Sequence, residues 1–494
     1  MDQAQIEALR DAPVPAGQLW INGQHRCAQD DATIDVISPL NGKVLTTIAR
    51  GSAADMDSAI TAARAAFDDG RWSDMAPGAR KAILLKWAAL IEANALELAV
   101  LGVRDNGTEI GMALKAEPMS AASTIRYAAE AIDKLYGQIA PTDTSTLGLV
   151  HREPVGVVGA IVPWNFPLMI GAWKLGPALA VGNTVVMKPP ETASLTLLRI
   201  AELATQAGLP DGVLNIVTGF GAEAGEALSL SMNVDVIAFT GSGPVGRRLM
   251  TNAAASNFKR VYLELGGKSP NVVFADAPDL NVAAKMAVYG VFRNAGQVCI
   301  AGTRLLVDRA IQDDFVARMV AITEDMVLGD PLDLGTMAGA VNNAAQLEQN
   351  LQFVADARAA GATICTGGER ILEDTGGYFI APTIISNLKT TDDVVRKEVF
   401  GPILAVIPFD SEDEAVALAN DTEYGLAAGV WTANLSRAHR MVRKINAGVV
   451  HVNTYGGADG SVPLGGRKQS GNGSDKSLHA FDKFLNLKTA WIKL

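Results

Sequence analysis

The chain of 494 residues is 49% hydrophobic and 19% charged, which is typical of a globular protein with two or three domains. Its 53 acidic residues outnumber 42 basic ones, and this balance argues against a nucleic acid or membrane partner, because phosphate binding needs a basic surface. The three cysteines and five histidines are scattered, so neither a disulfide framework nor a metal site is expected. The N-terminus lacks the basic and apolar runs of a signal peptide, and a cytoplasmic protein is predicted.

The first part of the chain is predicted to be mainly helical after one short strand. Residues 19–23 are typical of a strand, and an apolar face at helical spacing follows from Met56 to Phe67, with Ser52 near its start. A second helical pattern covers about residues 78–103.

Residues 155–173 carry no charge and are long enough to suggest a membrane span. Pro163, Asn165 and Pro167 interrupt this stretch. Prolines this close together would break a helix and leave backbone groups that lipid cannot satisfy. We therefore predict a buried strand that runs into a loop.

From about residue 155 strands alternate with helices. The clearest helix covers 194–207 and is followed by Gly208 and Pro210, which commonly end helices. Such alternation predicts a parallel, doubly wound sheet that binds ligands at the C-terminal ends of its strands. A second alternating block, about 271–452, predicts another α/β domain, and 484–494 is predicted to pair as a strand with a neighbouring subunit. The strands predicted in the first block are 157–162, 184–187, 213–217, 234–239 and 261–263.

The glycine-rich segment Gly241–Gly246 follows a predicted strand and begins a predicted helix. Glycines in this position let the backbone approach a pyrophosphate at a helix N-terminus. The segment by itself fits either a dinucleotide-binding loop or an ordinary tight turn. Glu264 lies about where a dinucleotide-binding fold would carry a ribose ligand.

Cys299 lies in the segment Asn294–Arg304, which is rich in small and polar residues. A lone cysteine is often a small buried hydrophobe, but a thiolate nucleophile is the other interpretation. A nucleophile would need a base and donors for an oxyanion. No convincing Cys-His-Asn order is present, so the base would be a carboxylate.

Seven short motifs follow one another along the chain: Pro163–Pro167, Lys188–Glu191, Phe239–Ser242, Leu263–Gly267, Gly296–Cys299, Glu398–Pro402 and Pro463–Gly466. With these motifs in this order, the chain resembles the aldehyde dehydrogenase superfamily over essentially its whole length. A CoA-acylating member would normally lack the glutamate at 264, and a non-catalytic paralogue would be expected to have lost Cys299, Asn165 or Glu264; all three are present.

The resemblance implies a role for each of these three side chains. Cys299 would attack the aldehyde to give a thiohemiacetal and, after oxidation, a thioester. The Asn165 amide and the Cys299 backbone N–H would stabilise the oxyanion. Glu264 would activate the water that hydrolyses the thioester, and for that reason we do not assign it to the ribose.

The resemblance also implies NAD as the cofactor. Lys188 and Glu191 would bind the adenosine ribose, and the carboxylate of Glu191 would repel a 2′-phosphate and so favour NAD over NADP. For Phe400, ordinary packing in the core is the alternative to a role in cofactor binding. The other expected cofactor-binding residues are Trp164, Gly241, Ser242 and Glu398.

The fold implied is α/β, with two doubly wound domains and a small β oligomerisation element. Residues 1–131 and 155–262 would form the Rossmann-like NAD-binding domain, and 263–466 the catalytic domain. Residues 132–154 and 467–494 would form the oligomerisation element of a homodimer or homotetramer.

Within the superfamily, the sequence is most similar to bacterial γ-glutamyl-γ-aminobutyraldehyde dehydrogenases and related aminoaldehyde dehydrogenases. The resemblance is strong at residues 468–473, 475–480 and 256–261. An amino- or acylamino-aldehyde is therefore the expected substrate. An acidic semialdehyde and an apolar aliphatic or aromatic aldehyde are the alternatives.

The expected substrate tunnel departs from the family pattern at Arg293, where an aromatic residue is common. We expect Arg293 to favour an aldehyde with a distant anionic group, unless it turns away into a structural ion pair. Asp475 replaces a common glutamate near the site, and Ser474 replaces a common arginine. Further expected tunnel residues are Phe166 and Trp173 as apolar walls, and Gly456, Ala458 and Leu464 at positions that are often bulkier.

Overall fold

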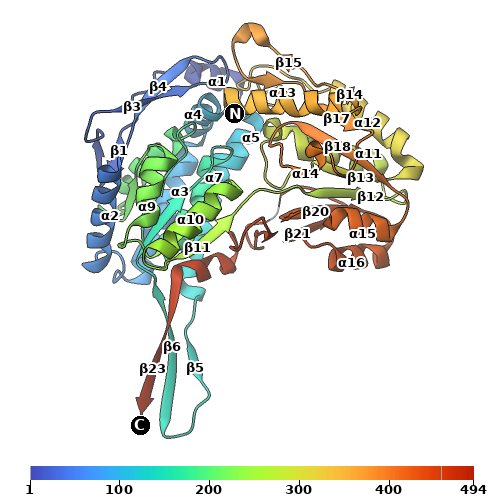
Figure 1. Ribbon diagram of the computed structural model, residues 1–494. Helices are drawn as coiled ribbons and strands as arrows, with labels where there is room; N and C mark the ends of the chain where they lie inside the picture. Colours follow the sequence, from blue (N-terminus) through green and yellow to red (C-terminus); the bar gives the residue numbers. More distant parts are fainter. Residues whose placement is uncertain (1, 458) are drawn as a thin grey trace.

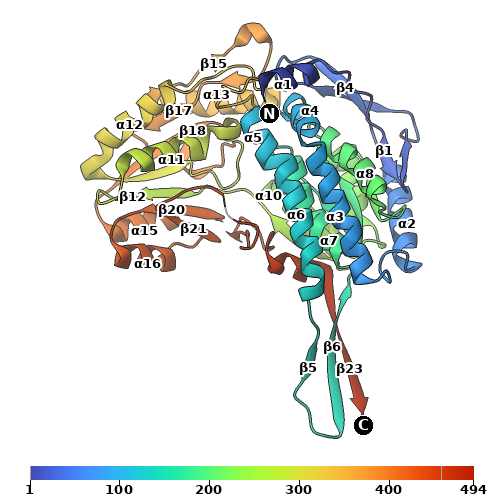
Figure 2. The same cartoon turned by 180° about the vertical axis from the view of Figure 1, so that it is seen from behind.

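The computed structural model describes residues 2–457 and 459–494. Two α/β lobes lie side by side, and a narrow β arm projects from beneath the first (Figures 1 and 2). Ala458, one of the expected tunnel positions, lies outside the described residues. Within them, no helix is both long and apolar enough to cross a membrane.

The first lobe is built on a sheet whose strands follow the order β11-β10-β7-β8-β9-β1-β2. The five strands from β11 to β9 are parallel, and β1 and β2 continue the sheet antiparallel. The parallel alternation predicted from residue 155 is thus confirmed. The strands are β1 (Leu19–Ile21), β2 (Gln24–Arg26), β7 (Val157–Ile161), β8 (Thr184–Lys188), β9 (Leu214–Ile216), β10 (Val236–Thr240) and β11 (Arg260–Glu264).

Helices cover both faces of this sheet, which explains why β7, β8 and β10 are buried along their whole length. In Figures 1 and 2, α2 (Ala53–Asp68), α9 (Glu226–Leu230) and α10 (Gly243–Ala255) lie on one face. The other face carries α3 (Pro77–Ala93), α6 (Ser120–Ala131), α7 (Pro167–Ala180) and α8 (Leu195–Ala207).

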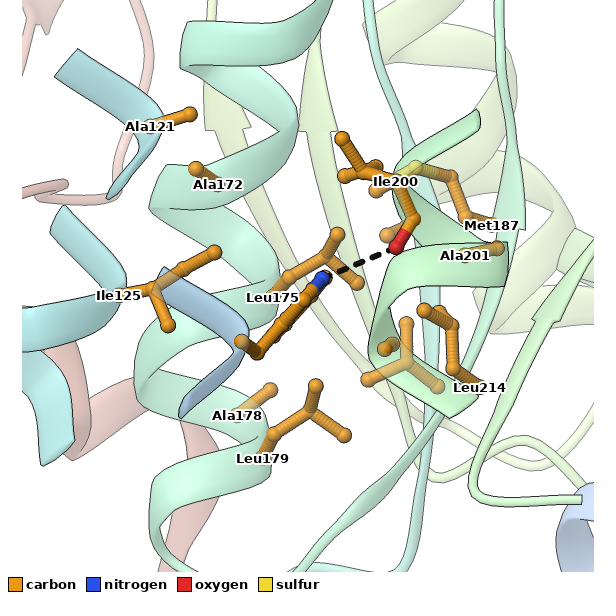
Figure 3. Close-up of a cluster of buried hydrophobic side chains, with 14 of the residues drawn as sticks. Ala121, Ile125, Ala172, Leu175, Ala178, Leu179, Met187, Ile200, Ala201 and Leu214 are labelled. Carbon is orange, nitrogen blue, oxygen red and sulfur yellow. Dashed lines mark hydrogen bonds between the residues drawn. The ribbon is translucent and has the colours of Figure 1, made fainter. Parts of the chain in front are cut away.

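The core beneath these helices is apolar and closely packed. Figure 3 shows Ile125 of α6, Leu175 of α7 and Ile200 of α8 converging between the helices and the sheet. The indole N–H of buried Trp87 donates to the Ile200 carbonyl at 2.9 Å, so the polar end of this large side chain is satisfied in the core.

The helix predicted at 78–103 is in fact two helices, α3 and α4 (Ala95–Asn106). Asn94 lies at the junction with non-helical dihedrals, and its side-chain amide donates to the Leu90 carbonyl at 2.7 Å. The asparagine thereby competes with the regular backbone ladder and allows the chain to bend. The predicted helix at 194–207 is confirmed as α8, which ends at Gly208 in the left-handed conformation.

The charge-free stretch forms β7, a loop and then α7, which begins at Pro167. The strand and the loop agree with the prediction. The helix was not predicted, but Pro167 occupies its first turn, where the missing N–H costs no hydrogen bond.

The second lobe has a sheet in the order β14-β17-β18-β13-β12-β20-β21, parallel except for the edge strand β14. It confirms the second α/β block. Its strands are β12 (Pro270–Val273), β13 (Arg304–Asp308), β14 (Thr363–Thr366), β17 (Thr383–Ser386), β18 (Ile403–Phe409), β20 (Ala427–Trp431) and β21 (Val449–Val452); the flanking helices are α11 (Leu280–Phe292), α12 (Gln312–Glu324), α13 (Ala344–Ala359), α15 (Glu412–Asn420) and α16 (Leu435–Lys444).

The arm is a three-stranded antiparallel sheet of β5 (Gln138–Ala140), β6 (Thr146–Pro154) and β23 (Leu485–Lys493). On one side β23 pairs along its length with β6 of the same chain, and its other side is an open edge of the sheet. Its predicted pairing with a neighbouring subunit stays a prediction. It leaves the body through the 3₁₀ helix Leu478–Phe484, which contacts α7. The domain boundaries expected from the resemblance stay predictions.

Candidate active site

Glu264 is the last residue of β11, at the C-terminal edge of the first sheet. It is only 5% exposed, and its Oε1 has no hydrogen-bond partner within the described residues. Gly471 crosses close behind it: a Cβ there would lie 2.0 Å from the Leu263 carbonyl oxygen, and its φ is +123°. A glycine is therefore required at the point where the C-terminal segment passes this strand.

Burial raises the pKa of the Glu264 carboxyl well above its usual range, and the negative charge of Asp475 raises it further. Lys174 and Lys483 oppose this effect. The side chain is thus a carboxyl poised to gain or lose a proton.

Asp475 lies between two buried ammonium groups. Lys174 of α7 contacts one carboxylate oxygen and Lys483 the other, and the three side chains are at most 5% exposed. Burial alone would raise the pKa of Asp475, but the two lysines outweigh it and hold the pKa below its usual range. We call this group the Asp475 triad. The sequence placed Asp475 on the substrate tunnel, whereas the structure encloses its carboxylate in the triad.

Cys299 follows a sharply turned segment. Asn294, Ala295 and Gly296 all have positive φ, and a Cβ on Gly296 would lie 2.1 Å from the Gly401 carbonyl oxygen. Burial raises the pKa of the Cys299 thiol to about 12, with the charges of Glu398 and Glu264 adding to the effect. The thiol is therefore protonated in this state and needs a base to become a nucleophile.

Asn165 lies in the loop between β7 and α7 and is 3% exposed. Its side-chain amide donates to the Gln297 carbonyl at 2.8 Å, and its own carbonyl accepts from the Asn294 amide at 3.1 Å. The hydroxyl of Thr108 in turn donates to Asn294 at 2.7 Å. This network ties the Asn165 loop to the segment that carries Cys299.

The predicted cofactor residues of the first lobe lie at the same sheet edge as Glu264. Lys188 ends β8 and is buried, and its ammonium lies 3.1 Å from the partly exposed Glu191. Gly241 follows β10 and donates its N–H to the Glu264 carbonyl at 3.0 Å. Ser242 occupies the capping position of α10 in an extended conformation but makes no side-chain capping bond within the described residues. The first N–H groups of this helix therefore suit an anion such as a pyrophosphate.

Glu398 and Phe400 approach from the second lobe. Glu398 accepts the Gly267 N–H at 2.9 Å, and burial raises the pKa of its carboxyl to about 7. A Cβ on Gly266 would lie 2.0 Å from this carboxylate, so the glycine makes room for it. Phe400 has a positive φ and stacks edge-on against Trp164 at 5.2 Å between ring centroids.

A cavity of about 270 Å³ opens beside the segment that carries Cys299, and we call it the inner cavity. Five residues that were predicted to line the substrate tunnel line this cavity: Phe166, Trp173, Arg293, Gly456 and Leu464. That the cavity is the tunnel stays a prediction. Arg293 makes no ion pair among the described residues; its Nε donates to the Tyr289 carbonyl at 3.0 Å. The remaining lining residues were not predicted, and they include Met112, Met169, Tyr289, Val298, Ile300, Tyr455 and Lys476.

The family model described as the Aldehyde dehydrogenase family matches residues 26–490. The chain belongs to this family. It is 49% identical over 477 residues to the NADP/NAD-dependent aldehyde dehydrogenase PuuC of Escherichia coli (strain K12), covering 97% of this chain and 96% of the relative. This aldehyde dehydrogenase also matches two solved structures over 100% of both chains, each at 48% identity and a TM-score of 0.98. They are an indole-3-acetaldehyde dehydrogenase in complex with NAD+ and the γ-glutamyl-γ-aminobutyraldehyde dehydrogenase from Burkholderia cenocepacia J2315.

Three charged residues of the site in this dehydrogenase were not predicted from its sequence. Lys174 and Lys483 complete the Asp475 triad, and Lys476 lines the inner cavity. Lys174 lies in an apolar helix, where a buried lysine signals a buried partner. Lys476 and Lys483 are lysines in a polar segment and carry no comparable signal. No group of three histidine, cysteine, aspartate or glutamate side chains in the described ranges could hold a metal ion.

Proposed function

We propose that this chain is an NAD-dependent aldehyde dehydrogenase for acylated aminoaldehydes of the γ-glutamyl-aminobutyraldehyde type, acting through a thioester on Cys299. The charge of the side chains that line the inner cavity is the main support for this substrate class. Its described lining contains the cationic side chains Arg293 and Lys476 but no carboxylate.

A free ammonium group close to the aldehyde would meet these positive charges without a counterion. An acylated nitrogen is a neutral amide, and it moves any charge of the substrate to the far end of the molecule. The apolar walls of Phe166, Trp173 and Leu464 suit the methylene chain of such a substrate. The name of the Burkholderia structure, a γ-glutamyl-γ-aminobutyraldehyde dehydrogenase, supports the same class.

In the first step Glu264 accepts the proton of the Cys299 thiol, directly or through one water, and the sulfur adds to the aldehyde carbon. The remaining N–H of the Asn165 amide and the Cys299 backbone N–H stabilise the oxyanion of the thiohemiacetal. The bond from Asn165 to Gln297 fixes the orientation of that amide.

NAD would bind along the C-terminal edge of the first sheet, on the side where Glu398 and Phe400 approach from the second lobe. Lys188 and Glu191 would hold the adenosine ribose, Gly241, Ser242 and the start of α10 the pyrophosphate, and Trp164, Glu398 and Phe400 the nicotinamide half. When bound, the cofactor accepts the hydride from the thiohemiacetal carbon. The partly exposed carboxylate of Glu191 favours a ribose with free hydroxyls, although the name of PuuC includes NADP.

After the oxidation Glu264 passes the proton that it took from Cys299 to solvent. In the last step Glu264 removes a proton from a water molecule, which attacks the thioester carbonyl. Burial raises the pKa of Glu264 and so makes it a stronger base than an exposed glutamate. The Cys299 thiolate leaves and takes the proton back from Glu264, which regenerates the thiol, and the product acid loses its own proton to solvent.

The experiment compares NADH formation from γ-glutamyl-aminobutyraldehyde and from the free aminoaldehyde, in the wild type and in Arg293→Ala. We expect kcat/KM to be higher for the acylated substrate and the variant to lose part of this advantage. If both substrates are oxidised equally, or a plain apolar aldehyde exceeds both, the substrate class is wrong.

Alkylation by iodoacetamide tests the nucleophile. We expect Cys299 to react faster than Cys27 or Cys365 and to be protected by NAD.

An apolar aromatic aldehyde is the second candidate substrate. The inner cavity has mainly apolar walls, and one structure of equal similarity is an indole-3-acetaldehyde dehydrogenase. Phenylacetaldehyde or indole-3-acetaldehyde belongs in the same comparison as a reference substrate.

We also propose that the protein is a cytoplasmic homodimer or homotetramer that assembles through the arm. The arm carries large apolar side chains that are mostly exposed in the single chain, and β23 forms one edge of its sheet. An apolar sheet with an open edge favours association with a second copy. The exposed side chains are Tyr136, Ile139, Leu487, Trp491 and Leu494.

A further inference from the structure

A second cavity, of about 340 Å³, lies next to the inner cavity, and we call it the outer cavity. Trp173 and Lys476 line both cavities and so form the boundary between them. The Lys476 ammonium lies 5.2 Å from the centroid of the Trp173 ring. A substrate longer than the inner cavity would reach this second space past these two side chains.

One wall of the outer cavity is a row of hydroxyl groups on α6. Ser120, Ser123, Thr124 and Tyr127 all line it. Their spacing of three, four and seven residues places them on one face of the helix. Ser120 and Thr124 are half-buried, and the Thr124 hydroxyl donates to the Ser120 carbonyl at 2.9 Å. This face offers several hydrogen-bonding groups without a net charge.

The outer cavity also contains one charge of each sign. Lys476 is half-buried and sits in a left-handed conformation, φ +61°, which directs this part of the chain around the cavity. Asp459 is exposed, and it lies close enough to Lys476 for each charge to affect the pKa of the other side chain. It accepts the Ser461 N–H at 2.8 Å, and bonds from Ser461 hold the pKa of its carboxyl below its usual range. Asp459 is therefore anionic at neutral pH.

The two cavities thus differ in the charges that they accommodate. The described lining of the inner cavity has cations and no carboxylate, whereas the outer cavity pairs a cation with a carboxylate beside four hydroxyls. A ligand with a neutral middle and a far end that carries both an ammonium and a carboxylate matches this division.

We propose that the outer cavity is a subsite for the tail of the substrate and that it recognises an amino-acid-like zwitterion. Lys476, with the hydroxyls of Ser120 and Ser123, binds the carboxylate of the tail, and Asp459 binds its ammonium group. The proposal rests on the proposed function, because the aldehyde end must occupy the inner cavity next to Cys299.

The test uses three N-acylated 4-aminobutyraldehydes of similar length. The γ-glutamyl compound carries both tail charges, the glutaryl compound only the carboxylate, and the pentanoyl compound neither. Wild-type kcat/KM should decrease in that order. Lys476→Gln should lower kcat/KM for the first two by roughly 10- to 100-fold, the loss of one charge-assisted hydrogen bond, and leave the pentanoyl compound within about twofold.

Asp459→Asn should lower kcat/KM for the γ-glutamyl compound alone and leave the glutaryl compound unchanged or improved. Lys476→Arg keeps the positive charge and should retain much of the preference, which separates a charge effect from misfolding. Lys86→Gln removes an exposed lysine of α3 that lines neither cavity and serves as the matched control.

Different results overturn the two proposals. If the wild type oxidises all three acylated compounds at equal kcat/KM, the proposed function stands and the tail subsite is wrong. An equal loss on all three in Lys476→Gln likewise overturns the subsite, because the lysine then acts at the reacting end. If none of the three is oxidised while an apolar aldehyde is, the proposed function itself fails.

Discussion

At the scale of single residues, the charge of Glu264 depends on the Asp475 triad. Lys174 comes from α7, Asp475 from the segment after the second lobe, and Lys483 from the helix before the arm. The triad carries one net positive charge when all three groups are ionised, and it lies close enough to Glu264 to affect the pKa of that carboxyl. Two of the three charges lower that pKa, which helps a buried base to lose its proton.

Glu264→Gln should form the thioester more slowly than the wild type, because the thiol then has only solvent as its base. It should hydrolyse the thioester more slowly still, because the amide cannot accept a proton from water. We expect a slowed burst of one NADH per active site followed by a steady-state rate lower by about 100-fold or more. Rapid-quench mass spectrometry should find the acyl group on Cys299. Glu348→Gln, an exposed glutamate of α13, is the control. A full loss of the burst would contradict this expectation, because hydrolysis would then not be the step that depends most on Glu264.

Lys483→Met removes one of the two cations that lower the pKa of Glu264. In a pH profile of kcat, the acidic limb that reports the base should therefore move to higher pH. Lys483→Arg should restore the profile, and Lys488→Met, on the exposed arm strand β23, should leave it unchanged. A variant that loses stability but keeps the wild-type profile would give Lys483 a purely structural role.

At the scale of elements, a buried carboxyl caps the helix that carries the site. Glu117 lies in a π-helical turn, Lys115–Met119, and accepts the N–H of Met169 in the first turn of α7 at 2.6 Å. Burial raises its pKa from 4.5 to about 8, so the folded protein holds it protonated near neutral pH. The orientation of α7, and with it Trp173 and Lys174, depends on this contact.

Because the folded pKa of Glu117 is raised, its contribution to stability is complete below pH 4.5 and is lost as the pH rises through about 8. Glu117→Gln is neutral at every pH and keeps an acceptor for Met169. The difference in melting temperature between variant and wild type should be near zero at pH 5 and favour the variant at pH 9. Each unit of pKa shift corresponds to about 1.4 kcal/mol. A pH-independent difference would contradict the assignment.

At the scale of the whole molecule, the arm stands away from both lobes (Figure 1). Its large apolar side chains are exposed in the single chain. Trp491 is 67% exposed and Leu487 is 70% exposed, on a strand paired on one side with β6. The arm is joined to the site through Lys483, which lies in the short helix directly before β23.

Leu487→Lys combined with Trp491→Glu should dissociate the oligomer, because two charges would be buried at the proposed interface. Light scattering after gel filtration should give the mass of a single chain, against a multiple of it for the wild type. Lys488→Gln on the same strand is the control. An unchanged oligomer would place the interface elsewhere.

Local signals in the sequence predicted the strands of the first parallel sheet and indicated the family. Apolar runs between turn residues predicted β7, β8, β9, β10 and β11, and glycine after an apolar periodicity predicted the end of α8, because these signals are local in the chain. The motifs around Asn165, Glu264 and Cys299 indicated the aldehyde dehydrogenase family. Where a local signal was misread, as at Asn94, a side chain competed with the backbone for a hydrogen bond.

Which charges meet depends on the tertiary structure. Lys174 and Asp475 are 301 positions apart, and nothing in their spacing predicts that they form an ion pair. The same holds for the hydroxyl row of α6, which borders Asp459 and Lys476 only because α6 and the segment 459–477 pack around the same cavity. Ion pairs and cavity walls depend on the packing of distant segments, and packing is a property of the whole fold.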